Sequence, residues 1–476
     1  MTLESAQQTF SSQLWEPTNG TDQSAIVSND PKPHDVKPVR VRSNGEQNKL
    51  SHEDRLVHDW YRFVLSYPPH LVRDYLDKFH VTPQQRVLDP FCGTGTTVVE
   101  CKKLGIPSVG IEANVFPHFA GQVKIDWTLD PDVLLNASRQ IAEEALAQLE
   151  RDGIEDDPLF RDWHAKERRT LPRLRSLDAG LDKLLLANSV SPLPMHKVLV
   201  LRDCIWRHQG ERYYKHQLLA FATALTFSIS NLHFGPEVGV GELKEDTPVV
   251  AIWLEKVRQM ASDLRQLAND KNTPALIHCA DARQVLQAIE PHSIDAVITS
   301  PPYPNEKDYT RTTRLESVML GFVNNKAELR DIKRSLVRSN TRGVYKGDDD
   351  DKWVEHHPEI QRLAEMIETR RIELGKTSGF ERQYGRVTKL YFGGMARHLA
   401  DLRTVLRPGA QLGYVVGDQA SYLRIMIRTG HILADIAKSL GYEVVRIDLF
   451  RTRIATATKE QLREEVVVLR WPGSSE

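Results

Sequence analysis

The sequence of 476 residues predicts an α/β fold, a doubly wound sheet that carries two insertions. Three observations lead to this prediction. Residues 86–112 contain a short apolar run, a glycine-rich turn, a helical pattern and a second apolar run that ends in an acid. The same rhythm of apolar runs and helical patterns returns at residues 275–303 and at residues 395–470. Helical or charged segments separate these blocks, so we expect one sheet assembled from three pieces of the chain.

Composition divides the chain into six segments. Residues 1–50 are rich in Ser, Gln, Asn, Asp and Pro and have little apolar periodicity, which predicts a mobile leader. The other segments are the first part of the core (51–129), a mainly helical insertion (130–270), the middle of the core (271–321), a charged insertion (322–390) and the last part of the core (391–476).

Short apolar runs rich in β-branched residues mark the strands that we expect in the core. They cover residues 86–88, 108–112, 275–279, 294–299, 412–416, 442–450 and 465–470. Apolar residues at helical spacing predict the core helices. These cover residues 58–79 (with a break at 67–69), 98–104, 395–405 and 432–440, and a turn is expected at 407–409.

The composition is that of a soluble globular protein, with 40% hydrophobic and 27% charged residues. No apolar run is long enough to cross a bilayer, and the N-terminus has no signal-peptide pattern, so we expect a cytoplasmic protein. A net charge of -1 neither favours nor excludes nucleic acid, because a DNA-binding enzyme needs only a local basic surface. Neither the histidines nor the cysteines have metal-ligand spacing, so no metal is expected. The four cysteines, expected as reduced thiols, are Cys92, Cys101, Cys204 and Cys279.

The first chemical motif is residues 89–97, which read DPFCGTGTT and follow the first expected strand. Glycines at this place let the backbone approach a ligand, and the helix that follows presents free N–H groups suited to a carboxylate. An ordinary glycine-rich turn would explain the glycines alone. Glu112, at the end of the next strand, could accept hydrogen bonds from two ribose hydroxyls, and its spacing favours a nucleoside ligand.

The second motif is residues 299–303, which read TSPPY and end another expected strand. An exocyclic base amine is a poor nucleophile, and acceptors such as the Ser300 hydroxyl could localise its lone pair. Two prolines fix the backbone and supply no N–H donors. Tyr303 offers a face on which an extruded base could stack. A rigid turn with a core tyrosine is the alternative interpretation of this segment.

Together, the two motifs resemble the amino-methylating DNA methyltransferases. The TSPPY segment is similar to the catalytic loop of the cytosine-N4 branch, whereas the adenine-N6 branch more often has Asp or Asn in place of Ser300. Residues 67–72 look like the segment that closes over the methionine part of the cofactor. Asp281 sits where this family contacts the adenine ring, and residues 407–418 look like its later core. The resemblance covers about half the chain, in separated blocks.

This resemblance implies a Rossmann-like seven-stranded methyltransferase sheet with its last strand antiparallel, and S-adenosylmethionine as cofactor. The implied mechanism is extrusion of the base followed by direct methyl transfer, without an enzyme nucleophile. The implied catalytic residues are Ser300, Pro301, Pro302 and Tyr303. The implied cofactor-binding residues are Tyr67, Asp89, Phe91, Gly93, Thr94, Gly95, Thr96, Thr97, Glu112 and Asp281.

Duplex DNA is the implied substrate, with a restriction endonuclease as a further partner. The large insertion precedes both Asp281 and Ser300, so target recognition is expected in residues 130–270, in residues 322–390, or in both. Six basic residues lie close together at 330–346, where a solvated charged loop is the equally weighted alternative because acids follow at 348–351. The residues predicted to contact DNA are Arg311, Arg314, Arg338 and Arg342.

Three other functions stay open from the sequence. They are a DNA adenine-N6 methyltransferase, an RNA base-amine methyltransferase and an inactive DNA-binding homologue. Ser300 argues against the first two, because their loops more often begin with Asp or Asn. The intact set of Glu112, Asp281, Ser300 and Tyr303 argues against the third. Cys92 follows Phe91 rather than a proline, so it does not form the Pro-Cys pair of cytosine-C5 enzymes.

Overall fold

A computed structural model describes residues 50–473, apart from residues 52, 64, 158–172, 236, 268–271, 306 and 455–459. All of the described residues belong to one unit, Ser43–Glu476. The leader predicted over residues 1–50 therefore lies, except for its last residue, outside the described residues.

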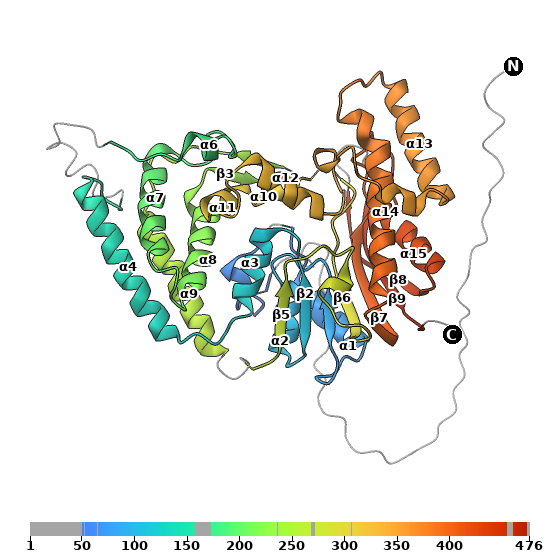
Figure 1. The fold of residues 1–476 in the computed structure, drawn as a ribbon, viewed down its shortest axis with the longest axis horizontal. Helices are drawn as coiled ribbons and strands as arrows, with labels where there is room; N and C mark the ends of the chain where they lie inside the picture. Colours follow the sequence, from blue (N-terminus) through green and yellow to red (C-terminus); the bar gives the residue numbers. More distant parts are fainter. Residues whose placement is uncertain are drawn as a thin grey trace, which may run out of the picture. The chain divides into compact units, whose positions relative to one another are not determined.

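A seven-stranded sheet lies at the centre of this unit (Figure 1). Its strands are β1 (Val87–Asp89), β2 (Ser108–Ile111), β5 (Ala275–His278), β6 (Ile294–Thr299), β7 (Leu406–Gly417), β8 (Glu443–Ile454) and β9 (Gln461–Arg470). Their order is β5-β2-β1-β6-β7-β9-β8, and the first five are mutually parallel. β9, the last strand of the chain, runs antiparallel to both of its neighbours. The predicted seven-stranded sheet with an antiparallel last strand is confirmed.

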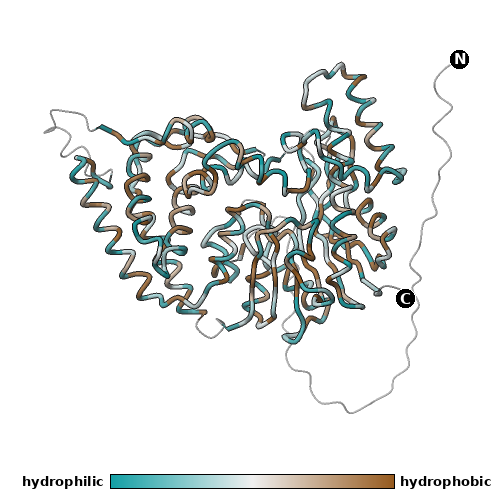
Figure 2. The backbone as a smooth tube through the Cα atoms, viewed as in Figure 1, coloured by the Kyte–Doolittle hydropathy of each residue, from teal (hydrophilic) through white to brown (hydrophobic). Residues whose placement is uncertain are grey.

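The order of the strands predicts where a ligand would bind, at the carboxyl ends of the strands beside β1. β1 pairs with β2 on one side and with β6 on the other, so the chain winds in opposite directions from β1. In open parallel sheets, ligands bind at the carboxyl ends of the strands where the winding reverses. The central strands β1, β2 and β6 are almost entirely buried, as expected for the parallel part of a sheet covered on both faces. Figure 2 shows hydrophobic residues concentrated in these central strands.

Helices cover both faces of the sheet. α1 (Pro69–Lys78) packs with Val87, Ile298 and Val415 on one face. α14 (Tyr384–Leu402) and α15 (Thr429–Ser439) pack with Leu88 and Val297 on the other face. Two further helices follow the first strands, α2 (Thr96–Lys103) and α3 (Val115–Lys124).

Two details of the last part of the core differ from the prediction. α14 begins at Tyr384, inside the predicted charged insertion, whereas the sequence pattern indicated a start at residue 395. Glycines at 393 and 394 weaken the helical pattern, yet Gly393 is required there because a Cβ would lie 1.9 Å from the Asp350 carbonyl oxygen. The turn predicted at 407–409 is an irregularity within β7, where pairing with β6 skips from Leu406 to Gln411.

The first insertion is mainly helical, as its composition indicates. It contains α4 (Pro131–Arg151), α6 (Ala179–Asp182), α7 (Pro192–Trp206), α8 (Tyr214–Ala224) and α9 (Val249–Gln266). It also contains a hairpin formed by the antiparallel strands β3 (Leu232–Phe234) and β4 (Val238–Val240). None of the described helices is long and apolar enough to span a membrane.

The middle part of the core ends in two short helices, α10 (Tyr309–Thr312) and α11 (Arg314–Met319), and the second insertion contributes α12 (Lys326–Ser335) and α13 (Pro358–Glu373). α12 has no buried residue, and Figure 2 shows it as predominantly hydrophilic. The insertion packs on the core through the close approach of Asp350 to Gly393.

Candidate active site

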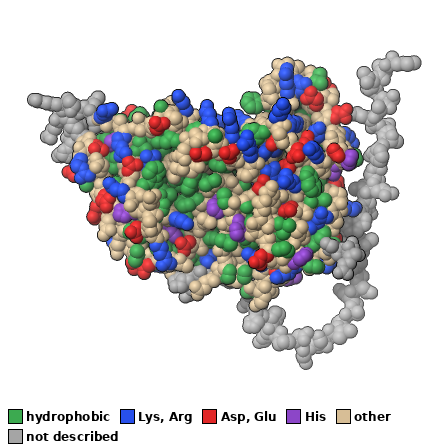
Figure 3. Space-filling view, in the orientation of Figure 1, with side chains coloured by type: hydrophobic (Ala, Val, Ile, Leu, Met, Phe, Trp, Pro, Cys, Tyr) green, Lys and Arg blue, Asp and Glu red, His purple; other side chains and the backbone are tan. Residues whose placement is uncertain are grey.

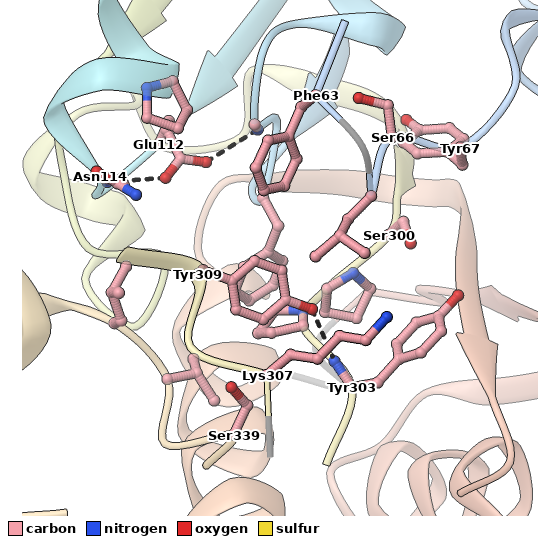
Figure 4. A pocket seen from close by; sticks show the side chains of 18 of the residues that line it. Phe63, Ser66, Tyr67, Glu112, Asn114, Ser300, Tyr303, Lys307, Tyr309 and Ser339 are labelled. Atoms are coloured by element: carbon pink, nitrogen blue, oxygen red, sulfur yellow. Dashed lines mark hydrogen bonds between the residues drawn. The ribbon is translucent and has the colours of Figure 1, made fainter. Parts of the chain in front are cut away.

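A cavity of about 700 Å³ lies at the carboxyl ends of the parallel strands. The glycine-rich turn after β1, the acid after β2 and the Ser-Pro-Pro-Tyr segment after β6 all line it (Figure 4). The second insertion contributes residues 335–340, and β8 contributes Phe450, Arg451 and Arg453. The two motifs singled out in the sequence therefore face one shared space.

The glycine-rich turn leaves room for a ligand. Gly93 has φ +52°, a conformation that favours glycine, and a Cβ built there meets no atom within 4 Å. Its N–H donates to Glu112 Oε2 at 2.9 Å. The Thr94 hydroxyl is buried beside it on the cavity wall and has no hydrogen-bond partner among the described residues. A buried hydroxyl without a partner is costly, so a ligand in the cavity is the natural partner for Thr94.

Glu112 lies opposite this turn. Its Oε1 accepts the Asn114 N–H at 2.7 Å and its Oε2 accepts the Gly93 N–H (Figure 4). Burial, together with the nearby Asp89 carboxylate, raises the pKa of Glu112 to about 7, although the two backbone donors lower it. A carboxylate has about four acceptor sites, so further donors from a ligand could be accommodated.

Asp89, Gly95 and Thr97 lie behind the cavity wall and hold it in place. The Asp89 Oδ1 accepts the Thr299 hydroxyl at 2.6 Å and the Phe91 N–H at 3.1 Å. Burial raises the pKa of Asp89 to about 6. Thr97 donates to the Ile298 carbonyl at 3.0 Å, which ties the helix after β1 to β6. The other predicted cofactor residues line the cavity: Tyr67, Phe91, Gly93, Thr94, Thr96, Glu112 and Asp281.

Asp281 is tied to the second insertion. Its Oδ2 accepts Arg283 Nη2 at 2.6 Å, and Arg283 also donates to Asp350 Oδ2 at 2.5 Å. Arg397 of α14 pairs with the other oxygen of Asp350 at 3.2 Å. The edge of the cavity that holds Asp281 is therefore linked through charged groups to the insertion and to α14.

The Ser-Pro-Pro-Tyr segment presents acceptors to the cavity. The Ser300 hydroxyl donates to the Val415 carbonyl of β7 at 3.2 Å and also interacts with the Tyr303 hydroxyl; a hydroxyl oxygen has two acceptor lone pairs, so it can still accept from a ligand. The Tyr303 N–H donates to the Tyr309 hydroxyl at 3.4 Å. The Tyr303 ring packs on Gly417, where a Cβ would come within 3.0 Å of the ring. Burial raises the pKa of Tyr303, and it raises the pKa of Tyr309 to about 12. Both phenols are therefore neutral at physiological pH.

Sequence reasoning missed Lys307. Its side chain lines the cavity and extends between Tyr303 and Tyr309 in the view of Figure 4. Burial and the nearby Arg453 lower the pKa of Lys307. Its backbone is fixed on both sides, because its N–H donates to Asn305 Oδ1 at 2.9 Å and its carbonyl accepts Asn340 Nδ2 at 3.0 Å. The sequence signal that could have indicated Lys307 is the polar run at residues 305–308, which begins two residues after the TSPPY motif.

The four arginines predicted to contact DNA lie in two different environments. Arg338 is 5% exposed and pairs with Asp348, while its other donors reach backbone carbonyls. Arg314 donates to the Thr310 and Leu184 carbonyls. DNA contact by either residue would break these internal bonds. Arg311 and Arg342 are each about one-third exposed near the cavity.

The known proteins that resemble this chain include a DNA methylase family and several type II methyltransferases. Residues 4–116 match the N6/N4 methyltransferase family described as DNA methylase. The type II methyltransferase M.BsoBI of Geobacillus stearothermophilus is 24% identical over 453 residues, which cover 88% of this chain and 85% of that protein. The chain is therefore similar to the N6/N4 DNA methylases, through the family match at residues 4–116 and at 24% identity to this type II methyltransferase. The type II methyltransferase M.AvaI of Nostoc sp. is also 24% identical, over 87% of this chain and 86% of that protein.

Shorter and weaker similarities accompany this relationship to the DNA methylases. The type II methyltransferase M.MjaII of Methanocaldococcus jannaschii is 36% identical over 78 residues, or 16% of this chain and 14% of that protein. The crystal structure of TrmN from Thermus thermophilus is 10% identical, with a TM-score of 0.28 over 88% of this chain and 52% of that chain. This last similarity is too low to add to the argument.

Proposed function

We propose that the protein transfers a methyl group from S-adenosylmethionine to the exocyclic N4 amine of cytosine in duplex DNA. One observation carries the proposal: the glycine-rich turn and the Ser-Pro-Pro-Tyr segment face a single cavity of about 700 Å³. A cavity of this size falls in the range that holds a small-molecule ligand. The relationship to type II DNA methyltransferases supports the same assignment.

The residues around the glycine-rich turn fit the cofactor. The open space over Gly93, the unpaired Thr94 hydroxyl and the spare acceptor sites of Glu112 suit a nucleoside with two ribose hydroxyls. S-adenosylmethionine would supply a methyl group on a positively charged sulfur. Thr94, Glu112 and Asp281 would hold it, and the bonds of Asp89 would keep the turn aligned with β6.

Ser300 and Tyr303 would prepare the base. Ser300 is fixed as an acceptor because its own hydrogen is donated to Val415, so it would accept a hydrogen of the target amine. Tyr303 would stack on the base, and most of the rate gain would come from positioning and hydrogen bonding. No enzyme nucleophile is needed. Burial raises the pKa of the Cys92 thiol well above its usual range, which makes it a poor nucleophile.

Lys307 favours cytosine over adenine in this proposal. In cytosine, the C2 carbonyl oxygen lies on the same edge as the N4 amine and the ring nitrogen N3. In adenine, the corresponding position after the N6 amine and N1 is a C2–H group. The Lys307 ammonium, lying by Tyr303 and Tyr309, offers donors to such an oxygen. A donor of this kind gives discrimination because a base without the acceptor leaves the buried group unpaired.

The surface over the second insertion suits DNA. Figure 3 shows Lys and Arg side chains gathered over α6 and α12, at the edge where the strands end. Such a local basic surface can bind phosphates although the whole chain has a net charge of -1. The type II relatives further suggest that the protein works in the cytoplasm beside a restriction endonuclease that reads the same DNA site.

Methyl transfer from labelled S-adenosylmethionine tests this function. The protein is incubated with duplex DNA or with tRNA, and incorporated label is counted for the wild type and for Ser300→Ala. The proposal requires label in duplex DNA that depends on Ser300. Label in tRNA with none in DNA would assign an RNA base-amine methyltransferase instead. Cofactor binding without transfer to either substrate would indicate an inactive homologue.

A further inference from the structure

Glu237 joins the two insertions beside the cavity. It lies in the turn between β3 and β4 and lines the cavity. Its Oε2 is 3.3 Å from Nη1 of Arg311 in α10, and the same oxygen is 3.5 Å from Nη1 of Arg342. One carboxylate oxygen from the first insertion therefore holds two arginines that belong to segments more than seventy residues further along the chain.

The charges around Glu237 are unbalanced. Two guanidinium groups share one carboxylate, and Lys307 is close enough for the Glu237 charge to offset part of the lowering of its pKa by burial and Arg453. The Nε of Arg311 is buried without a partner in the part of the chain that the structure describes. These basic groups would be satisfied more fully by an anion with several oxygens than by one carboxylate oxygen.

Resting on the DNA substrate proposed above, we propose that Arg311 and Arg342 together bind one backbone phosphate of the DNA, and that Glu237 occupies this site until the phosphate displaces it. A phosphate offers oxygens to both guanidinium groups at once, which is the arrangement that arginine recognises best. The exchange is easy because these ion pairs are weak at this exposure: the side chains are 31%, 35% and 46% exposed for Arg311, Arg342 and Glu237.

The proposal predicts that Glu237 competes with DNA. Glu237→Gln keeps the shape of the side chain and removes its charge, so the two arginines become free for phosphate. Affinity for duplex DNA should then rise about fivefold, as expected for loss of a competing exposed ion pair. The matched control is Glu242→Gln, which makes the same charge change at an exposed acid that pairs with no basic group among the described residues. Its affinity should stay near that of the wild type.

Fluorescence anisotropy with a labelled duplex, measured over a range of salt, separates the outcomes. Arg342→Gln should lower the salt slope of binding by about one, as expected for loss of one phosphate contact. Arg258→Gln, an exposed arginine that pairs with Glu255 within α9, should not. The gain from Glu237→Gln should vanish when Arg311 and Arg342 are both replaced by Gln, because no freed site remains.

Two results would overturn the phosphate site. One is equal DNA affinity for the Glu237→Gln and Glu242→Gln variants. The other is a gain from Glu237→Gln that survives replacement of both arginines, which would be a general effect of charge. Thermal unfolding by circular dichroism checks that each variant folds. Arg342→Lys keeps the charge but loses the forked geometry of the guanidinium group, so its DNA affinity should lie between those of the wild type and Arg342→Gln. A wild type that neither binds nor methylates DNA would instead refute the proposed function.

Discussion

Replacing Ser300 by alanine removes the acceptor that we assign to the target amine and changes little else. The hydroxyl donates one hydrogen bond of 3.2 Å to the Val415 carbonyl. The two prolines that follow Ser300 restrict the backbone of the loop in the variant as well. The variant should therefore keep its fold. We expect the free energy of unfolding to fall by about 1 kcal/mol, the usual net value of one hydrogen bond.

The effect on methyl transfer should be much larger than the effect on stability. Loss of one positioned hydrogen-bonding group from a transition state lowers kcat by about 10²–10³-fold in other enzymes. We assign Ser300 to the target amine, and Gly93 and Thr94 of the turn to the cofactor. The Kd for S-adenosylmethionine should therefore stay within about twofold of the wild-type value, well below the tenfold change that 1.4 kcal/mol would give. The loss should therefore appear in the chemical step.

Single-turnover transfer of a labelled methyl group to duplex DNA measures that step. Ser421→Ala, at an exposed serine that lines the same cavity, is the matched control and should retain the wild-type rate. Equal rates for the Ser300 and Ser421 variants would remove the hydroxyl from the chemistry. An equal loss of rate and of cofactor binding would mean that Ser300 supports the cavity instead of the amine.

Three other predictions concern the cofactor, the second insertion and the base. Cofactor affinity should fall as the pH drops through about 7, by at most tenfold per pH unit, because protonation of Glu112 weakens it as an acceptor for ribose hydroxyls; isothermal titration should show this. Gly393→Ala should destabilise the protein by about 2–3 kcal/mol in thermal unfolding, because its Cβ would overlap the Asp350 carbonyl. Lys307→Met should lower kcat/KM for cytosine by about 10–10²-fold in steady-state assays, because it removes the donor to the base.

Each of these predictions has its own control. Glu112→Gln should remove the step near pH 7, and a step that persists in this variant would assign the titration to another group. Gly347→Ala, where an added Cβ meets no atom, should leave stability unchanged, and equal unfolding of the two glycine variants would contradict the packing argument. Lys307→Arg should retain part of the activity, whereas equal loss in both Lys307 variants would favour a purely steric role.

The central strands of the sheet could be predicted because buried strands appear in the sequence as short apolar runs. β1, β2 and β6 are almost entirely buried and rich in apolar residues, and their bounds lie within one residue of the prediction. The β3–β4 hairpin could not be predicted, because it consists of three-residue strands whose residues are mostly exposed or half-exposed. α14 was predicted too short because its inner glycines make a tertiary contact that no local pattern reveals.

The site was predictable only where a motif follows a strand. Gly93, Glu112 and Ser300 were found this way, and all three line the cavity. The basic run at residues 330–346 did not reveal which of its arginines are exposed. Arg338 belongs to a basic run, but it is buried against Asp348, ten residues away. Lys307 had no motif of its own, because its place beside the tyrosines depends on how the second insertion folds over the sheet.

Identification of the methylated nucleoside tests the central claim most directly. DNA from a host without its own methyltransferases, expressing either the wild type or Ser300→Ala, is digested to nucleosides and analysed by chromatography with mass detection. N4-methyldeoxycytidine should appear with the wild type and be nearly absent with the variant. N6-methyldeoxyadenosine, 5-methyldeoxycytidine or no modified nucleoside in the wild-type sample would contradict the assignment of cytosine N4 as the target.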